Sequence, residues 1–181
     1  LDAVDAFYLR LAGADRPLSI LDAGCGTRRL ACMLAARGHK VTGFDPAPAM
    51  LSIARSRPGG AQVDWIEGNA TALPRDRTYD LVIMTGNVFQ VFLTDDAALI
   101  TLTAIRARLS PQGRFAFETR NPAVREWLSW TPAETAKVLD IPGEGRTEVH
   151  YDVTDEHDGI VTYDTHFAFA DGARAVARSW L

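Results

Sequence analysis

Ile20-Leu21-Asp22-Ala23-Gly24-Cys25-Gly26-Thr27 is the stretch that decides the fold of this chain. Leu18 to Leu21 form an apolar run typical of a buried strand, and Leu30 to Ala36 have the spacing of a helix. Gly24 and Gly26 lie between them, where the absence of a Cβ permits left-handed backbone and close approach of a ligand. A strand, a glycine turn and a helix in this order predict the nucleotide-binding edge of a doubly wound sheet.

Asp45 supports this interpretation from the next predicted strand, Val41 to Asp45. It follows the glycine turn by about 20 residues, the spacing of a carboxylate that accepts hydrogen bonds from a ribose. The sequence therefore predicts a cofactor that contains adenosine. A dinucleotide-binding turn needs a third glycine for tight helix packing, whereas Arg28 and Arg29 stand here. This disfavours a nicotinamide cofactor, although an NAD(P)-binding oxidoreductase stays open as an alternative.

Composition places the chain among globular cytoplasmic domains. Its 181 residues are 47% hydrophobic and 23% charged, with a net charge of −4. No cluster of basic residues indicates nucleic-acid binding, and no apolar run is long enough to span a membrane. Cys25 and Cys32 match neither a disulfide framework nor a zinc site, which favours a reducing compartment. Because the chain starts at Leu1 and stops inside a strand-like pattern, we expect it to be a fragment of a longer protein.

Alternating strands and helices predict an α/β fold, a Rossmann-like, doubly wound and mostly parallel sheet flanked by helices. Residues 1–16 have the spacing of a helix that either caps the sheet or forms a lid whose Tyr8 reaches the cofactor. Pro46 is expected in the first turn of a helix that carries Met50, Ile53 and Ala54 inward. A further helix is predicted to start at Thr94 and to bury Leu99, Leu102, Ile105 and Leu109. The predicted strands cover 18–21, 41–45, 63–66, 79–84 and 114–119, with a turn at 110–113 before the last.

The pattern changes beyond residue 121, so we expect a cofactor-binding region over 1–121 and an extension over 122–181. The extension is predicted to contain a short helix at 125–130, an irregular segment at 135–145 and a three-stranded antiparallel meander. The turns of the meander are expected at 155–159 and 171–172. The meander would serve as a cap, an extension of the sheet or a homodimer contact, and the spacing of its histidines matches no metal site.

Four motifs resemble those of the class I S-adenosylmethionine-dependent methyltransferases, over about residues 18–120. They occur in the order and at the spacing of that family. The motifs are Asp22 to Thr27, Val41 to Met50, Tyr79 to Val82 and Leu109 to Arg114. The resemblance implies S-adenosyl-L-methionine as the cofactor and a small molecule as the methyl acceptor.

The resemblance also implies a set of cofactor-binding residues. Asp45 would bind both ribose hydroxyls, Met50 would cover the adenine, and Asn69 with Ala70 would read the adenine edge. The backbone of Thr85 and Gly86 would meet the methionine ammonium group. The full implied set is Asp22, Gly24, Cys25, Gly26, Asp45, Pro46, Met50, Asn69, Ala70, Thr85 and Gly86. Arg28 departs from the family, which has glycine there, so Arg28→Gly is predicted to tighten cofactor binding.

Methyl transfer from a sulfonium needs alignment of the acceptor more than it needs a base, and the sequence contains no obvious catalytic base. Asn87 and Gln90 follow the fourth strand, where they could orient an amine or hydroxyl of the substrate, or satisfy only their own loop. Glu118 and Arg120 lie where the fifth strand ends and are further candidates for substrate binding, with an internal ion pair as the alternative. The sequence thus predicts methyl transfer to nitrogen or oxygen; the second alternative is a non-catalytic, methyltransferase-like interaction protein.

Overall fold

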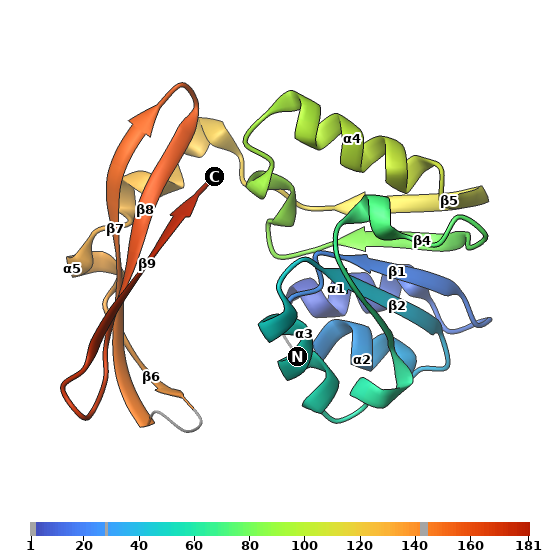
Figure 1. Cartoon of the computed structure of the whole chain (residues 1–181), viewed down its shortest axis with the longest axis horizontal. Helices are drawn as coiled ribbons and strands as arrows, with labels where there is room; N and C mark the ends of the chain where they lie inside the picture. Colours follow the sequence, from blue (N-terminus) through green and yellow to red (C-terminus); the bar gives the residue numbers. More distant parts are fainter. Residues whose placement is uncertain (1–2, 28, 142–144) are drawn as a thin grey trace. The chain divides into compact units, whose positions relative to one another are not determined.

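The computed structural model describes residues 3–27, 29–141 and 145–181. The chain divides into two compact units (Figure 1). The first comprises Leu1–Phe89 and Thr94–Thr119, and the second comprises Gln90–Leu93 and Arg120–Leu181. Each unit has its own sheet, so the two are described in turn.

The first unit is built on a parallel sheet of five strands in the order β3-β2-β1-β4-β5. The central strand β1 pairs in parallel with β2 on one side and with β4 on the other, so the strand order reverses beside β1. This confirms the Rossmann-like prediction. The strands are β1 Ser19–Ala23, β2 Lys40–Asp45, β3 Asp64–Glu67, β4 Tyr79–Met84 and β5 Leu109–Phe117.

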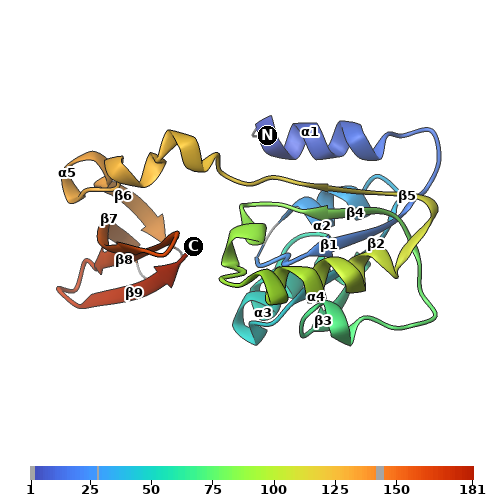
Figure 2. The same ribbon diagram turned by 90° about the horizontal axis from the view of Figure 1, so that it is seen from above.

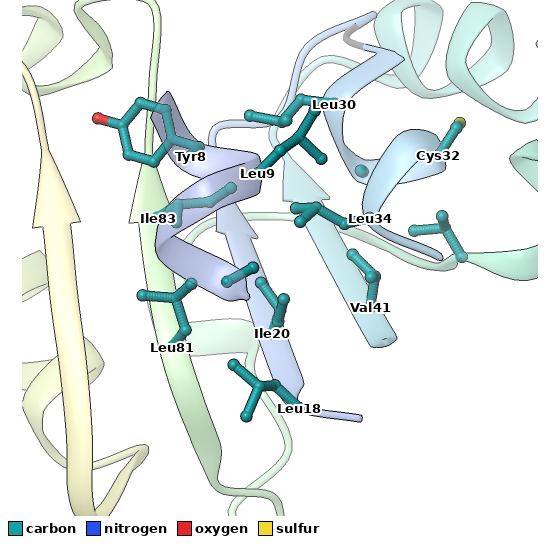
Figure 3. Packing of buried hydrophobic residues seen from close by; sticks show 13 residues of the cluster. Tyr8, Leu9, Leu18, Ile20, Leu30, Cys32, Leu34, Val41, Leu81 and Ile83 are labelled. Carbon is teal, nitrogen blue, oxygen red and sulfur yellow. The ribbon is translucent and has the colours of Figure 1, made fainter. Parts of the chain in front are cut away.

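Helices cover both faces of this sheet, with α1 on one side and α4 on the other (Figure 2). The helices are α1 Ala3–Ala12, α2 Arg29–Ala35, α3 Pro48–Ser56 and α4 Asp95–Arg106, with 3-10 turns η1 Gly60–Gln62, η2 Ala70–Ala72 and η3 Val88–Val91. Side chains from α1, α2, β1, β2 and β4 meet in one apolar cluster (Figure 3). Tyr8 and Leu9 of α1 are buried in this cluster, so α1 is a packed helix of the core.

The first turn and the buried face of α3 differ from the sequence prediction. The helix begins at Pro48, with Ala47 as its N-cap, and Pro46 lies outside it. Leu51 and Ala54 are buried, whereas Met50 and Ile53 are 44% and 49% exposed. The predicted inward set was therefore wrong for Met50 and Ile53. Two stripes of apolar residues lie side by side on this short helix, and spacing alone cannot tell which one packs on the sheet.

α4 and β5 show two further differences. Thr94 caps α4 as predicted, accepting a hydrogen bond from the Ala97 amide at 3.2 Å. Of the predicted stripe, however, only Ile105 is buried, and Leu99 is 63% exposed. The predicted turn at 110–113 lies inside β5 as an irregularity, because Tyr79 pairs with Leu109 and Leu81 pairs with Arg114. An extra stretch of chain is thus accommodated within the strand.

The second unit contains an antiparallel sheet of four strands in the order β6-β7-β8-β9. The strands are β6 Lys137–Ile141, β7 Gly145–His157, β8 Ile160–Ala168 and β9 Arg174–Trp180, preceded by η4 Pro122–Val124, η5 Glu126–Ser129 and α5 Pro132–Thr135. The prediction of three strands was wrong, because β6 lies in the segment expected to be irregular; residues 142–144 of that segment lie outside the described residues. These strands form a sheet of their own and do not extend the parallel sheet.

The β7–β8 hairpin follows the predicted turn chemistry. Asp158 and Gly159 connect the strands with φ angles of 51° and 78°. Two left-handed residues give the tight turn whose twist matches a hairpin.

Across the described part of the chain, no helix is long and apolar enough to span a membrane.

Candidate functional site

The carboxyl ends of β1, β2 and β4 lie side by side at one edge of the parallel sheet. Ala23 at the end of β1 pairs in register with Phe44, one residue before the end of β2. Asp22 pairs in register with Ile83, just before the end of β4. In open α/β sheets, ligands bind outside these strand ends where the strand order reverses, which here is beside β1. The glycine turn, Asp45 and Thr85 all follow strands at this edge.

The glycine turn has the backbone that the sequence predicts. Gly24 and Gly26 have φ angles of 69° and 53°, in the left-handed region. A Cβ on Gly24 would lie 2.5 Å from Cγ1 of Val88, a contact that no side chain could keep. Gly24 is therefore required both by its conformation and by the Val88 side chain packed against it. No motif in the sequence indicated this contact with Val88.

Asp45 fixes the geometry of this edge. Its Oδ2 accepts a hydrogen bond from the Gly26 amide at 2.8 Å, and its Oδ1 accepts one from the Ala47 amide at 2.9 Å. The carboxylate is buried and joins the glycine turn to the start of α3. Each carboxylate oxygen can accept more than one hydrogen bond, so this pre-oriented group retains acceptor capacity for a ligand hydroxyl.

Asp22 and Cys25 form the floor beneath the turn. Both are fully buried, and the Cys25 amide donates to the Phe44 carbonyl at 3.0 Å. Burial raises the pKa of the Cys25 thiol strongly, and the nearby carboxylates of Asp22 and Asp45 raise it further. Cys25 is thus a neutral thiol that contributes packing and backbone, not a nucleophile.

Met50 and Pro46 lie on the segment after β2, and both are exposed. An exposed methionine at the start of α3, near the pre-oriented Asp45, is available to cover the face of a flat ligand. The exposure that contradicts the predicted packing of Met50 is therefore compatible with its predicted contact to the cofactor.

Asn69 caps the turn η2 after β3. Its Oδ1 accepts hydrogen bonds from the Thr71 amide at 3.0 Å and from the Thr71 hydroxyl at 2.6 Å. Ala70 is buried next to it. Because the amide oxygen already accepts two hydrogen bonds, the group left for a ligand is the NH₂ of Asn69.

Thr85 and Gly86 follow β4. Thr85 is buried, and its hydroxyl has no hydrogen-bond partner within the described residues. A buried hydroxyl of this kind at a ligand-binding edge fits a site for a polar group. Gly86 has a φ of 70° and donates its amide hydrogen to Oε1 of Glu118.

Glu118 connects this loop to α1, which the sequence did not predict. Its other oxygen, Oε2, accepts a hydrogen bond from the Tyr8 hydroxyl at 2.9 Å. Glu118 was predicted to contact substrate or to form an ion pair, and Tyr8 to pack or to form a lid. The two side chains instead join the end of β5, the loop after β4 and α1. Only the fold brings together residues separated by 110 positions.

The predicted substrate residues fall in different units. Asn87, in the first unit, has a φ of 62°, an uncommon conformation that often marks functional sites. Gln90 and Arg120 lie in the second unit, where Oε1 of Gln90 accepts a hydrogen bond from the Arg120 amide at 3.0 Å. The Arg120 guanidinium donates to Glu126 at 3.0 Å and lies over the ring of Trp130.

Arg28, whose replacement by glycine is predicted to tighten cofactor binding, lies outside the described residues. Trp130 is buried and packs against Tyr151 and Tyr163. In the described parts of the chain, no group of three or more histidine, cysteine or acidic residues could hold a metal ion.

This edge of the Rossmann-like sheet has the features of a nucleotide-type site. They are a glycine turn, a pre-oriented acid at the end of the second strand and a buried hydroxyl after the fourth. Residues 20–113, slightly more than half of the chain, match the family model of the methyltransferase domain. The chain belongs to the class I S-adenosylmethionine-dependent methyltransferases, and S-adenosylmethionine is the cofactor of that family.

Comparison with known proteins gives the same family. The chain is 31% identical over 118 residues to a ubiquinone/menaquinone biosynthesis C-methyltransferase from Rubrivivax gelatinosus, covering 64% of this chain and 45% of that protein. The chain spans about half the length of the curated relatives that it matches.

Solved structures share the fold over nearly the whole chain. A sugar N-methyltransferase from Streptoalloteichus has a TM-score of 0.75 at 16% identity, with 99% of this chain and 72% of that chain covered. An amino pentose methyltransferase of calicheamicin biosynthesis from Micromonospora echinaspora, solved with S-adenosylmethionine bound, has a TM-score of 0.69 at 22% identity, with 97% and 72% covered.

Proposed function

We propose that this chain binds S-adenosylmethionine at the carboxyl edge of its parallel sheet and transfers the methyl group to nitrogen or oxygen of a small molecule. The buried Asp45 carboxylate supports this proposal most strongly, because the amides of Gly26 and Ala47 hold it beside the glycine turn. A pre-oriented acceptor binds a ribose without the cost of ordering the side chain first.

The chain's residues fit this cofactor. We assign the ribose hydroxyls to Asp45, the adenine to Met50 and to the Asn69–Ala70 segment, and the methionine end to Gly24, Thr85 and Gly86. The exposure of Met50 supports its role, and the left-handed backbone of Gly24 and Gly86 supports close approach of the cofactor. When bound, the cofactor supplies a methyl group already activated on a sulfonium.

The protein's contribution to the reaction is then mostly alignment. The nucleophile must lie in line with the carbon–sulfur bond, and positioning of this kind provides a large part of the rate. We assign this positioning to Asn87, which lies in the loop after β4 and has a left-handed backbone conformation. Gln90 and Arg120 stay candidates for substrate contact, with the amide NH₂ of Gln90 still able to donate.

The proposed acceptor atom is nitrogen or oxygen. Two structures of the same fold are named as methyltransferases of an amino pentose and of a sugar nitrogen, whereas a relative in sequence is named as a C-methyltransferase. The test is to incubate the protein with S-adenosylmethionine carrying a labelled methyl group and with matched amines, alcohols, phenols and activated carbon acids. Label on amines or hydroxyls supports the proposal; label on carbon alone contradicts it, and absence of transfer despite cofactor binding indicates a non-catalytic member.

We also propose that the protein acts in the cytoplasm and forms a homodimer through the second unit. Two free, buried cysteines support a reducing compartment. The edge strands β6 and β9 expose Val138, Val176 and Trp180, and an exposed apolar edge strand favours pairing with another strand. Light scattering of the wild type and of Val176→Asp tests the dimer: a monomeric wild type contradicts it.

A further inference from the structure

A cavity of about 510 Å³ lies on the first unit between α2 and the segment that follows α3. One wall is a single stripe of α2, since its residues recur every three or four positions. The other wall is the chain that leaves α3 and enters η1. The lining residues are Arg29, Cys32, Met33 and Ala36 from the first wall, with Arg57, Pro58, Gly59 and Gln62 from the second.

Close backbone approach at Gly59 shapes this cavity. Gly59 has a φ of 84°, and a Cβ there would lie 3.3 Å from Cβ of Cys32. Any other residue there would strain the left-handed backbone and would require Cys32 to shift by a few tenths of an ångström. The close approach of the two walls therefore favours glycine at this position.

The polar side of the cavity is cationic. The Nε atom of Arg57 is buried and has no hydrogen-bond partner within the described residues. Arg29, on the opposite wall, is held in place by Asp5, to whose Oδ2 its Nε donates at 3.2 Å. None of the eight lining residues is acidic. The guanidinium groups of Arg29 and Arg57 therefore make this side of the cavity positively charged, which favours an anion through charge-assisted hydrogen bonds.

The remaining walls are apolar. Met33, Ala36 and Pro58 contribute carbon surface, and Cys32 is a buried thiol. Burial raises the pKa of the Cys32 thiol, although Arg57 opposes this shift, so Cys32 adds no negative charge. The cavity therefore combines a guanidinium, which binds planar oxyanions well, with an apolar surface that can contact the hydrocarbon part of a ligand.

We infer that this cavity binds a small organic anion, a carboxylate or phosphate ester on a compact apolar body. Its anionic group would accept hydrogen bonds from Arg57 and from the NH₂ of Gln62, while its carbon body would pack on Met33 and Pro58. None of these residues belongs to the cofactor site proposed above, so the two sites are tested separately.

The experiment is a calorimetric titration of the protein with benzoate, phenyl phosphate and the neutral benzamide. We expect one or both anions to bind and benzamide to bind at least tenfold more weakly. The benzoate and phenyl phosphate arms identify which oxyanion the site prefers. Arg57→Gln is expected to weaken anion binding about tenfold or more, because a hydrogen bond to a charged group is lost. Arg55→Gln, an exposed arginine on α3 outside the cavity, is the matched control and should leave affinity unchanged.

A second variant tests the same cavity in case Arg57→Gln does not fold. Ala36 is exposed at the end of the α2 stripe, so Ala36→Trp should fill the cavity without disturbing the core. It should abolish anion binding and leave the affinity for S-adenosylhomocysteine unchanged. The inference is overturned if neither anion binds the wild type, if Arg55→Gln weakens binding as much as Arg57→Gln, or if Ala36→Trp binds the anions normally. If the wild type does not bind S-adenosylhomocysteine, that result would instead contradict the proposed function.

Discussion

Oδ2 of Asp45 accepts a hydrogen bond from the backbone amide of Gly26 at 2.8 Å. This contact joins the end of β2 to the turn after β1, so the acid and the glycine turn hold each other in place. The predicted ribose-binding carboxylate is thus also part of the structure of the turn. Its removal should affect both ligand affinity and stability.

Asp45→Ala is expected to lower the affinity for S-adenosylhomocysteine by more than tenfold and the free energy of unfolding by about 2 kcal/mol, because the partly buried amides of Gly26 and Ala47 lose their acceptor. Calorimetry and urea unfolding measure the two effects. Asp76→Asn, an exposed acid in the loop before β4, is the control and should change neither by much. Unchanged affinity in a folded Asp45→Ala protein would refute the ribose assignment.

Asn69→Asp should tighten cofactor binding several-fold. The amide oxygen of Asn69 is already used by Thr71, whereas a carboxylate offers a second oxygen to the exocyclic amine of adenine. The gain should disappear with the inosine analogue of S-adenosylhomocysteine, which lacks that amine. An equal gain with both ligands would show that Asn69 does not face the adenine edge.

The Tyr8–Glu118–Gly86 chain predicts strong coupling between two mutations. Tyr8→Phe should lower the free energy of unfolding by about 1 kcal/mol, and Glu118→Ala by about 1–3 kcal/mol because the Gly86 amide loses its acceptor. The double variant should be about as stable as Glu118→Ala alone. Simple additivity of the two losses would mean that the Tyr8 hydroxyl does not stabilise the protein through Glu118. Glu67→Gln controls for loss of an exposed charge.

The second unit should show a defined loss of stability in acid. Arg178 donates to both carboxylate oxygens of Asp164 at 2.8 Å, and these hydrogen bonds lower the pKa of Asp164. A group with a lowered folded pKa stabilises the protein above its unfolded pKa of about 3.9, and this contribution is lost as the pH falls through the folded pKa. The melting temperature of the wild type should therefore fall more steeply below pH 4 than that of Asp164→Asn. Asp155→Asn, an exposed acid on β7, should follow the wild type; parallel curves for all three proteins would argue against the pair.

The sequence predicted the parts of the fold that depend on local chemistry. The glycine turn, the cap at Thr94 and the Asp158–Gly159 hairpin each need a particular residue type at a particular position, so they could be read directly. Burial was harder, because Met50 and Leu99 have the spacing of core residues yet are exposed, and which stripe of a helix packs is decided by the sheet beneath it.

The candidate site also contains residues that the sequence could predict and residues that it could not. Asp45 could be predicted from its spacing, because strand, turn and acid occur in a fixed order. Val88 and the Tyr8–Glu118 contact could not be predicted, because they join segments that are distant in sequence and meet only after the parallel sheet has formed. β6 was missed because its pairing with β7 is visible only in the register of the sheet.

A calorimetric comparison of S-adenosylhomocysteine with NAD and NADP, on the wild-type protein and on Asp45→Ala, tests most directly whether the glycine turn and Asp45 form an S-adenosylmethionine site. We predict that S-adenosylhomocysteine binds the wild type, that Asp45→Ala weakens this binding more than tenfold, and that neither dinucleotide binds. Preferential binding of NAD or NADP, or no binding of S-adenosylhomocysteine to the folded wild type, would rule out this site.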